Sequence, residues 1–208
     1  MSEDKVLSKK ALARKDKIKA VALELFLTKG YQETSLSDII KLSKGSYSNI
    51  YDTFKSKEGL FFEILNDVCK AHFDTISSQI KKIQSNDLKE ILHSFAVNFM
   101  EIFNQAGAVN FGKIIYSQAY KQDKEFANWI EKNQKIFASN ILVEYFKKQE
   151  NAYLAKNASK LAELFCIMLK EPHHTLNVLA NTRVMNKKER EKHIEFVIDF
   201  FIQAIKSR

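Results

Sequence analysis

The sequence predicts an all-α fold, and three observations support this class. Only 5 of the 208 residues are Gly and 1 is Pro, whereas β-sandwiches and barrels need a Gly- or Pro-type turn every ~8–12 residues. Hydrophobic residues make up 45% of the chain and aromatic residues 12%, a composition that argues against disorder. No apolar run reaches the roughly 18 residues that a membrane-spanning helix requires, so we expect no membrane partner.

The charge distribution is compatible with nucleic-acid binding. Lys and Arg number 33 against 25 Asp and Glu, for a net charge of +8. Seven basic residues lie between Lys5 and Lys19 against one acid, Asp16; such a stretch either contacts phosphates or forms a solvated helix face. The amino-terminal residues lack the apolar segment of a secretory signal, and two cysteines make no disulfide framework, so a cytoplasmic location is expected.

The first two helices are predicted by apolar spacing and by their end signals. Apolar residues at helical spacing indicate a helix over about residues 8–29, which Gly30 ends. A second helix begins at Thr34 or Ser35, both good N-cap residues, and ends by Ser43.

A turn and a weak third helix follow. Lys44-Gly45 is a turn signal, and residues 46–51 consist mostly of weak helix formers. We therefore expect this third helix to be marginal and to become ordered only against DNA.

The organisation changes near residue 56, after which the predicted helices are longer and rich in Phe. Residues 105–110, which include Gly107, are expected to form a loop, and one helix ends before Pro172 because the residue before proline resists the α region. The expected helices bring the total to about 9–10 and cover about residues 57–83, 87–104, 110–120, 123–149, 157–170, 173–181 and 187–206.

The last predicted helix is apolar over more than one stripe. One apolar face consists of Ile194, Val197, Ile198, Phe201 and Ile205. The apolar surface extends beyond this face through Phe196, Phe200 and Ile202. The preceding long helix adds Leu161, Leu164, Phe165 and Leu169. We expect a homodimer in which the two C-terminal helices of each copy form a four-helix interface. The alternative is a core helix within a monomer.

Residues 34–61, TSLSDIIKLSKGSYSNIYDTFKSKEGLF, have helix-turn-helix proportions. Together with KIKAVALELFLTKGYQETS upstream, this segment resembles the DNA-binding signature of TetR-family transcriptional repressors. The FGKIIYSQ and MLKEP segments also resemble the corresponding segments of repressors of multidrug efflux pumps in that family. The resemblance implies a three-helix DNA-binding domain at residues 1–56 and a larger helical ligand-binding and dimerisation domain at residues 57–208. It also implies a repressor that hydrophobic ligands release from its operator.

The resemblance places the DNA contacts on and around the third helix. The start of a recognition helix faces the major groove, where Asn can bind adenine and where Ser and Tyr more often reach phosphates. The candidate contacts to operator double-stranded DNA are Thr34, Ser35, Lys44, Ser46, Tyr47, Ser48, Asn49, Tyr51 and Lys57. Capping or solvation is the alternative role for each of them, and core packing is the alternative for Tyr51. In the family, Gly usually stands where this chain has Lys44, so the turn geometry is in question.

The second domain offers a lining for a small amphipathic ligand with an anionic end. Aromatic walls beside scattered polar groups suit bile acids and other hydrophobic drugs. The candidate ligand-binding residues are Cys69, His72, Phe99, Phe103, Phe111, Ile115, Trp129, Phe137, Cys166, Lys170 and His174. Ordinary core packing is the alternative for each. We expect no metal at His173-His174, because no further ligand lies at suitable spacing, and no cofactor.

Two other functions would account for parts of the sequence. A global regulator of several operons would need no drug ligand. A helical lipid or sterol carrier would need the Phe-rich body but not the helix-turn-helix spacing. An enzyme is not expected, because the chain lacks a nucleophile–base pair and a phosphate-binding Gly loop.

Overall fold

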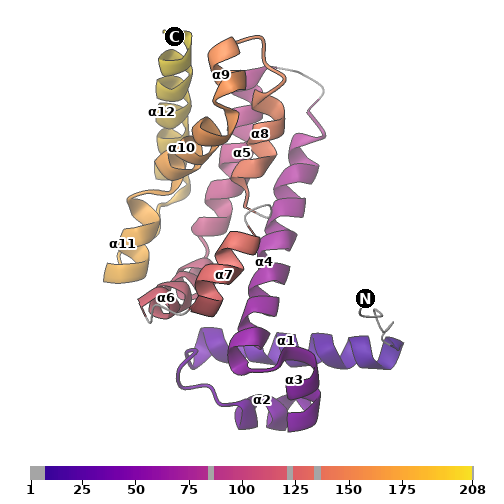
Figure 1. Cartoon of the computed structure of the whole chain (residues 1–208). Coiled ribbons are helices and arrows are strands. Elements are labelled where there is room, and N and C mark those ends of the chain that lie inside the picture. Colours follow the sequence, from indigo (N-terminus) through magenta and orange to yellow (C-terminus); the bar gives the residue numbers. More distant parts are fainter. Residues whose placement is uncertain (1–7, 84–86, 121–123, 134–136, 208) are drawn as a thin grey trace. The chain divides into compact units, whose positions relative to one another are not determined.

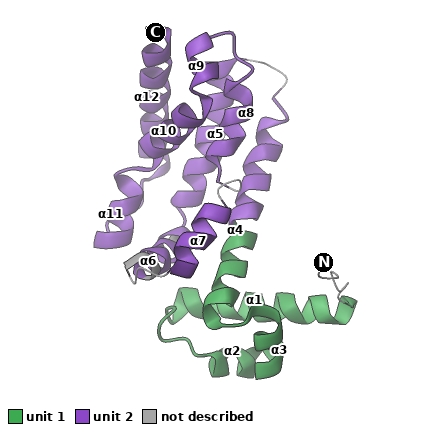
Figure 2. Ribbon diagram, in the orientation of Figure 1, with its two compact units in different colours: residues 1–68 green, residues 69–208 purple. Residues whose placement is uncertain are grey.

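The computed structural model describes residues 8–83, 87–120, 124–133 and 137–207, and within these ranges the chain is helical with no strand (Figure 1). It divides into two compact units, residues 1–68 and residues 69–208 (Figure 2). Among the described residues, no helix combines the length and hydropathy needed to cross a membrane. The all-α prediction is confirmed.

Unit 1 contains three helices and the beginning of a fourth. These are α1 (Lys9–Thr28), α2 (Leu36–Ser43), α3 (Tyr47–Phe54) and the first part of α4 (Lys57–Ile80). The side chains of Phe26, Tyr31 and Phe61 form its aromatic centre, with ring centroids 5.0–6.2 Å apart. These contacts fix α1 and α4 against each other, and α2 packs on α1.

The junction between α3 and α4 is tight enough to require glycine. The Ser56 hydroxyl accepts a hydrogen bond from the Gly59 amide at 3.0 Å and so caps α4. A Cβ atom on Gly59 would lie 2.0 Å from the backbone oxygen of Phe54. The sequence SKEG therefore sets how closely α4 follows α3, which a longer side chain at residue 59 would prevent.

Unit 2 contains the rest of α4 and eight further helices in its described part. These are α5 (Leu88–Phe103), α6 (Ala106–Tyr120), α7 (Lys124–Lys132), α8 (Ser139–Phe146), α9 (Ala152–Lys156), α10 (Ala158–Lys170), α11 (His173–Ala180) and α12 (Lys187–Lys206). Helix α10 packs against α5, α8 and α12, and α12 also packs against α5. Four fully buried or nearly buried rings, Phe95, Phe146, Phe165 and Phe201, meet where these helices converge.

Three sequence expectations are wrong. Residues 105–110 are not a loop, because α6 begins at Ala106 and the isolated Gly107 is tolerated in its first turn. Residues 123–149 do not form one helix: α7 ends at Lys132, where the side-chain amide of Asn133 donates to the Trp129 carbonyl at 2.8 Å and competes with continuation of the helix. Helix α9 was not expected, and the Asn151 side chain caps it at 2.8 Å from the Leu154 amide.

We predict that Phe95→Ala lowers the free energy of unfolding by about 3–5 kcal/mol, because Phe95 is fully buried and its loss leaves a cavity. Val97 lies two residues further along the same helix and is 41% exposed. Val97→Ala should therefore change the free energy of unfolding by about 0.5 kcal/mol or less. Urea unfolding followed by circular dichroism measures both; equal costs would place the core elsewhere.

Candidate functional site

The turn between α2 and α3 forms despite the displaced glycine. Residues 44–46 link Ser43, the last residue of α2, to Tyr47, the first of α3. Lys44 adopts the left-handed conformation, with φ 57° and ψ 34°, and the Gly45 amide donates to the Ile40 carbonyl at 3.2 Å. A non-glycine residue in this region costs about 1–2 kcal/mol, which the rest of the turn offsets. The turn thus keeps its shape with Lys where the family usually has Gly.

The expected recognition helix is present as α3, and its dependence on DNA for order stays a prediction. The Ser46 hydroxyl accepts a hydrogen bond from the Asn49 amide at 3.2 Å, which caps the start of α3. On the inner side, Ile50 and Phe54 are buried in unit 1. Capping and burial together offset the weak helix propensity of the segment.

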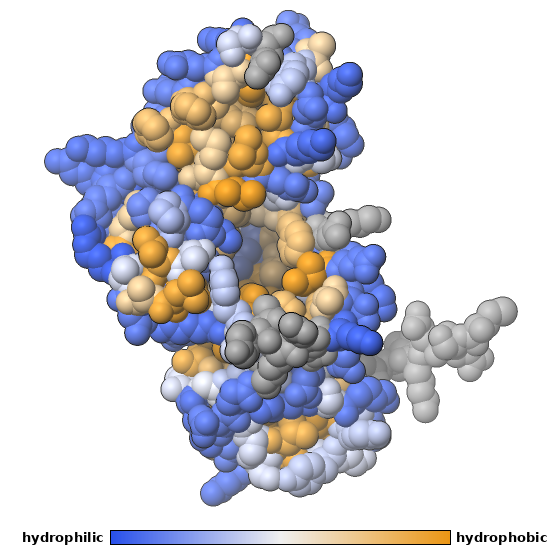
Figure 3. Space-filling view, turned by 60° about the vertical axis from the view of Figure 1, so that its left-hand side comes forward, coloured by the Kyte–Doolittle hydropathy of each residue, from blue (hydrophilic) through white to orange (hydrophobic). Residues whose placement is uncertain are grey.

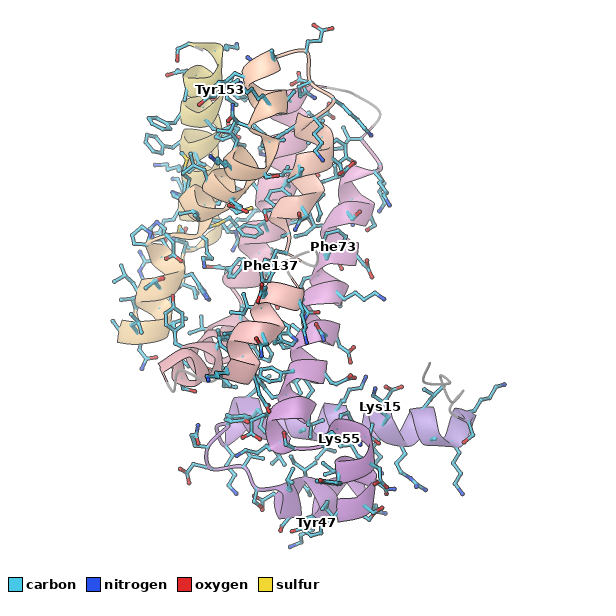
Figure 4. The ribbon with its side chains drawn as sticks, viewed as in Figure 1. Lys15, Tyr47, Lys55, Phe73, Phe137 and Tyr153 are labelled. Carbon is cyan, nitrogen blue, oxygen red and sulfur yellow. The ribbon has the colours of Figure 1, made fainter. Side chains whose placement is uncertain are left out.

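Two tyrosines project from α3 into solvent. Tyr47 is 59% exposed and Tyr51 is 67% exposed, so Tyr51 does not pack in the core. The Tyr47 hydroxyl hydrogen-bonds the Ser37 hydroxyl of α2, and the Lys55 ammonium lies 6.0 Å from the centroid of the Tyr51 ring. Figure 4 shows Tyr47 and Lys55 in unit 1. The two rings are therefore available to a partner while each retains a contact with the protein.

Neighbouring polar groups on α3 are partly engaged within the helix. The exposed Ser48 hydroxyl donates to the Asp52 carboxylate at 2.8 Å. Asn49 is half-buried, and its backbone amide takes part in the cap. Lys44 is exposed at the turn. Of these residues, Asn49 carries the side chain best suited to bidentate recognition of a base.

Three predicted contacts have structural roles at the ends of helices. The Thr34 side chain is buried and donates to the Gly30 carbonyl at 2.7 Å, so it does not reach the surface. The exposed Ser35 caps α2 through a reciprocal pair of hydrogen bonds with Asp38. The Lys57 ammonium donates to the carbonyls of Tyr31 and Thr34, each at 3.0 Å. It ties the start of α4 to the loop after α1.

Sequence reasoning missed two residues of this surface, Ser37 and Lys55. Ser37 contacts Tyr47 across the turn, ten positions along the chain, which no local spacing rule reveals. Lys55 ends α3 with a φ of 68° and is exposed; its charge after Phe54 was the available signal.

Unit 2 contains a cavity of about 640 Å³ whose walls come from α4, α5, α7, α10 and the segment leading into α8. Seven of the eleven predicted ligand residues line it: Cys69, His72, Phe99, Phe103, Phe137, Cys166 and Lys170. The lining also includes residues that were not predicted: Phe73, Ile102, Ile130, Ala138, Ser139, Asn140, Glu163 and Ile167. Figure 3 shows a hollow with apolar side chains on its walls, and Figure 4 labels Phe73 and Phe137. The Cys69, His72 and Phe73 positions follow one another on α4 at helical spacing.

Four predicted ligand residues do not line this cavity. Phe111 is buried and Ile115 is half-buried on α6, a helix that packs against α11. Trp129 stacks with Phe126 on α7. His174 is buried on α11 and lines a second, much smaller cavity. The prediction treated every aromatic helix as part of one wall, whereas α6 and α11 pack against each other and the Trp129 ring contacts a ring of its own helix.

Two charged residues of α10, Glu163 and Lys170, line the main cavity. The Lys170 ammonium is 3.0 Å from the Glu171 carboxylate and 5.6 Å from the centroid of the Phe103 ring. Glu163, which precedes Lys170 by about two turns of α10, also lines the cavity. Burial lowers the pKa of the His72 imidazole below its ordinary value, so that His72 is neutral at pH 7. The cavity thus presents apolar walls, one cation, one carboxylate and a neutral imidazole.

The two cysteines of the cavity are protonated thiols. Burial raises the pKa of Cys69 to about 11 and that of Cys166 to about 12. Neither thiol is poised as a nucleophile, because the thiolate is the reactive form. Within the described residues, no three His, Cys, Asp or Glu side chains stand close enough together to hold a metal ion.

The helix-turn-helix region matches a known family. Residues 18–64 match the family model for bacterial regulatory proteins of the tetR family. The chain is also 56% identical over 52 residues, 25% of its length, to the HTH-type transcriptional regulator QacR of Staphylococcus aureus (strain Mu50 / ATCC 700699). That match spans only 28% of the relative's own length. The helix-turn-helix region is therefore similar to the corresponding region of bacterial regulatory proteins of the tetR family.

The whole fold is shared with solved regulators of low sequence identity. A TetR-family transcriptional regulator from Mesorhizobium loti superposes with a TM-score of 0.82 at 19% identity, over 95% of this chain and 98% of the other. The transcriptional regulator FadR of Bacillus subtilis, solved with stearoyl-CoA, gives a TM-score of 0.67 at 17% identity, over 90% and 97%. These likenesses confirm a TetR-like fold with a helix-turn-helix unit and a larger helical unit.

We predict that both thiols react slowly with iodoacetamide at pH 8. Raising the pKa of Cys69 from 9.0 to about 11 lowers its thiolate fraction about 100-fold, and Cys166 is lowered further. Mass spectrometry of alkylation in the native and the urea-unfolded protein compares the rates. Equal rates in both states would contradict the buried, protonated assignment.

Proposed function

We propose that this TetR-family regulator represses transcription as a homodimer bound to operator DNA and leaves the operator when an amphipathic ligand occupies the cavity of unit 2. The observation that carries the proposal is the 640 Å³ cavity in a chain whose other unit holds a formed helix-turn-helix. Sites for small molecules typically occupy 300–1,000 Å³ and combine apolar walls with few polar groups. This cavity meets both conditions.

The proposed DNA contacts divide into base readers and phosphate contacts. Tyr47 and Asn49, at the start of α3, are placed to enter the major groove, as recognition helices do. Tyr51, Lys44, Ser46, Ser48 and Ser35 are the proposed backbone contacts, since they are exposed at or near α3. Lys57 holds the loop after α1 and stands at the start of α4, where the helix dipole favours a phosphate.

The proposed ligand is a hydrophobic molecule with an anionic end, such as a bile acid. Phe73, Phe99 and Phe137 offer apolar surface, and Lys170 offers a charge for a carboxylate or sulfonate. Glu163 on the same wall disfavours a second negative group. The target gene set that fits such ligands is a multidrug efflux operon, as the sequence resemblance implies.

Helix α4 is the proposed route between ligand and DNA. Its residues Leu60 and Phe61 are buried in unit 1, while Cys69, His72 and Phe73 line the cavity of unit 2. A ligand that binds better to a protein conformation unable to hold the operator shifts the population toward that conformation; equal affinity for both would shift nothing.

The homodimer is proposed to form through α10 and α12. Phe165, Leu169, Val197 and Phe201 are buried within the single chain, but Leu164, Phe196 and Phe200 are 47–67% exposed. The rings of Phe196 and Phe200 stack, with centroids 6.3 Å apart. Large apolar side chains exposed on adjacent turns favour burial against a second copy, which also supplies the paired DNA-reading helices that an operator of two half-sites needs.

The proposed function is tested by fluorescence anisotropy with DNA from upstream of a multidrug efflux operon of the same genome, at fixed salt. We expect binding in the nanomolar range that a titration with cholate reverses. Tight binding that cholate leaves unchanged would reject this ligand class. Weak binding that does not depend on DNA sequence would reject the operator assignment.

We predict that Asn49→Ala and Lys44→Ala weaken operator binding in different ways. Loss of a base contact at Asn49 should cost about 1–3 kcal/mol and relax specificity at one base pair. Loss of a phosphate contact at Lys44 should weaken operator and random DNA alike and reduce the salt slope by about 1. Anisotropy on both DNAs across a salt series separates them, and each variant is the control for the other. Identical behaviour of the two would remove the assigned roles.

We predict that Phe196→Ser combined with Phe200→Ser yields monomers at micromolar concentration, because the variant removes the exposed apolar pair of α12. Leu42→Ser is the matched control, since Leu42 is 56% exposed on α2 in unit 1. Sedimentation velocity reads the oligomeric state. A double variant that stays dimeric would place the interface elsewhere.

A further inference from the structure

Beside the main cavity lies a second cavity of about 10 Å³, and the two share Phe103 and Lys170 in their linings. That volume accommodates about one water-sized group. The small cavity is also lined by His173, His174 and Asn177 of α11 and by residues of α5. The two shared side chains therefore lie between the large cavity and the small one.

His174 gives the small cavity an unused hydrogen-bonding atom. The residue is only 7% exposed, and its Nδ1 is buried without a hydrogen-bond partner in the described structure. A buried polar nitrogen without a partner is costly, so such atoms commonly serve a ligand or a water molecule. None of the contacts within α11 or from α6 satisfies it.

The ring of His174 is fixed in place from two sides. Its edge packs on the Phe103 ring, with centroids 4.9 Å apart. On the other side α6 approaches closely: a Cβ on Gly112 would lie 3.1 Å from His174 Nε2 and 2.7 Å from a Val178 methyl. Only glycine fits at residue 112 without displacing these groups. The orientation of Nδ1 is thus set by the fold before any ligand arrives.

The charge states of His174 and Lys170 determine which kind of chemical group can occupy the small cavity. Burial, and then the charge of Lys170, lower the pKa of the His174 imidazole, so that it is neutral at pH 7 with one nitrogen as an acceptor. An acceptor repels a carboxylate, and the neighbouring Lys170 ammonium repels a cation. A neutral donor of the size of one hydroxyl remains.

We propose that the small cavity is a subsite for a single hydroxyl group of a ligand that occupies the main cavity, and that this hydroxyl donates its hydrogen bond to Nδ1 of His174. The inference rests on the proposed ligand-binding function and adds to it a rule of selection. The apolar rings of the ligand stay in the main cavity, its anionic end stays on the main-cavity side of Lys170, and a hydroxyl reaches past Phe103 into the small cavity.

The test compares cholate with 5β-cholanate, the same type of steroid acid without ring hydroxyls, by isothermal titration calorimetry. In the wild type we expect cholate to bind more tightly. In His174→Phe, which keeps a ring but loses the acceptor, we expect the ratio of the two affinities to fall about tenfold. His93→Phe, which replaces an exposed imidazole of α5 that lines neither cavity, is the control, and there the ratio should stay as in the wild type. An unchanged ratio in His174→Phe would overturn the proposal.

A second measurement needs no variant and so decides the matter even if His174→Phe fails to fold. In protein labelled with ¹⁵N-histidine, cholate should shift the Nδ1 resonance of His174, whereas 5β-cholanate should not. The same shift with both steroids, no shift with either, or no binding of either to the wild type would each refute the subsite. If cholate shows the preference through His174 but does not release the operator, the subsite stands and the proposed function fails.

Discussion

The structure depends on one helix serving two cores. In its first part, α4 buries Leu60, Phe61 and Ile64 in unit 1; in its last part, it buries Ile76 and Ile80 in unit 2. Between them, Cys69, His72 and Phe73 line the cavity. The helix that contributes to the lining of the cavity therefore also contributes to the core of unit 1.

Hydrogen bonds at helix ends add to the stability that the buried core gives unit 1. Ser35 and Asp38 cap α2, Ser46 caps α3 and Ser56 caps α4, while the Lys57 ammonium holds the loop after α1. Each cap contributes about 1 kcal/mol, which matters in short helices that bury few side chains. Several predicted DNA contacts thus also have structural roles. The tyrosines of α3, Tyr47 and Tyr51, are largely exposed to solvent.

Much of the fold could be predicted because its helices have strong local signals. Apolar spacing with a cap or a stop located α1, α2, α10 and α12, and the Pro172 break separated α10 from α11. The sequence did not reveal that α7 ends before Asn133. The hydrogen bond from the Asn133 side chain to the Trp129 carbonyl cannot be inferred from an Asn in the sequence, because polar residues also occur within helices. Nor could composition distinguish rings that line the cavity from rings that are buried elsewhere, such as Phe111. That distinction depends on which helices pack together, a property of the tertiary structure.

We propose that ligand binding in the cavity and operator binding are coupled through α4. The most direct test is whether each ligand weakens the binding of the other by the same factor. The measurement is the dissociation constant of cholate for the free protein and for the protein saturated with operator DNA. Linkage requires that operator weaken cholate binding by the same factor by which cholate weakens operator binding. We expect the two ratios of dissociation constants to be equal and well above one. The same affinity for cholate in both states would contradict it, because a ligand indifferent to DNA cannot act as an inducer.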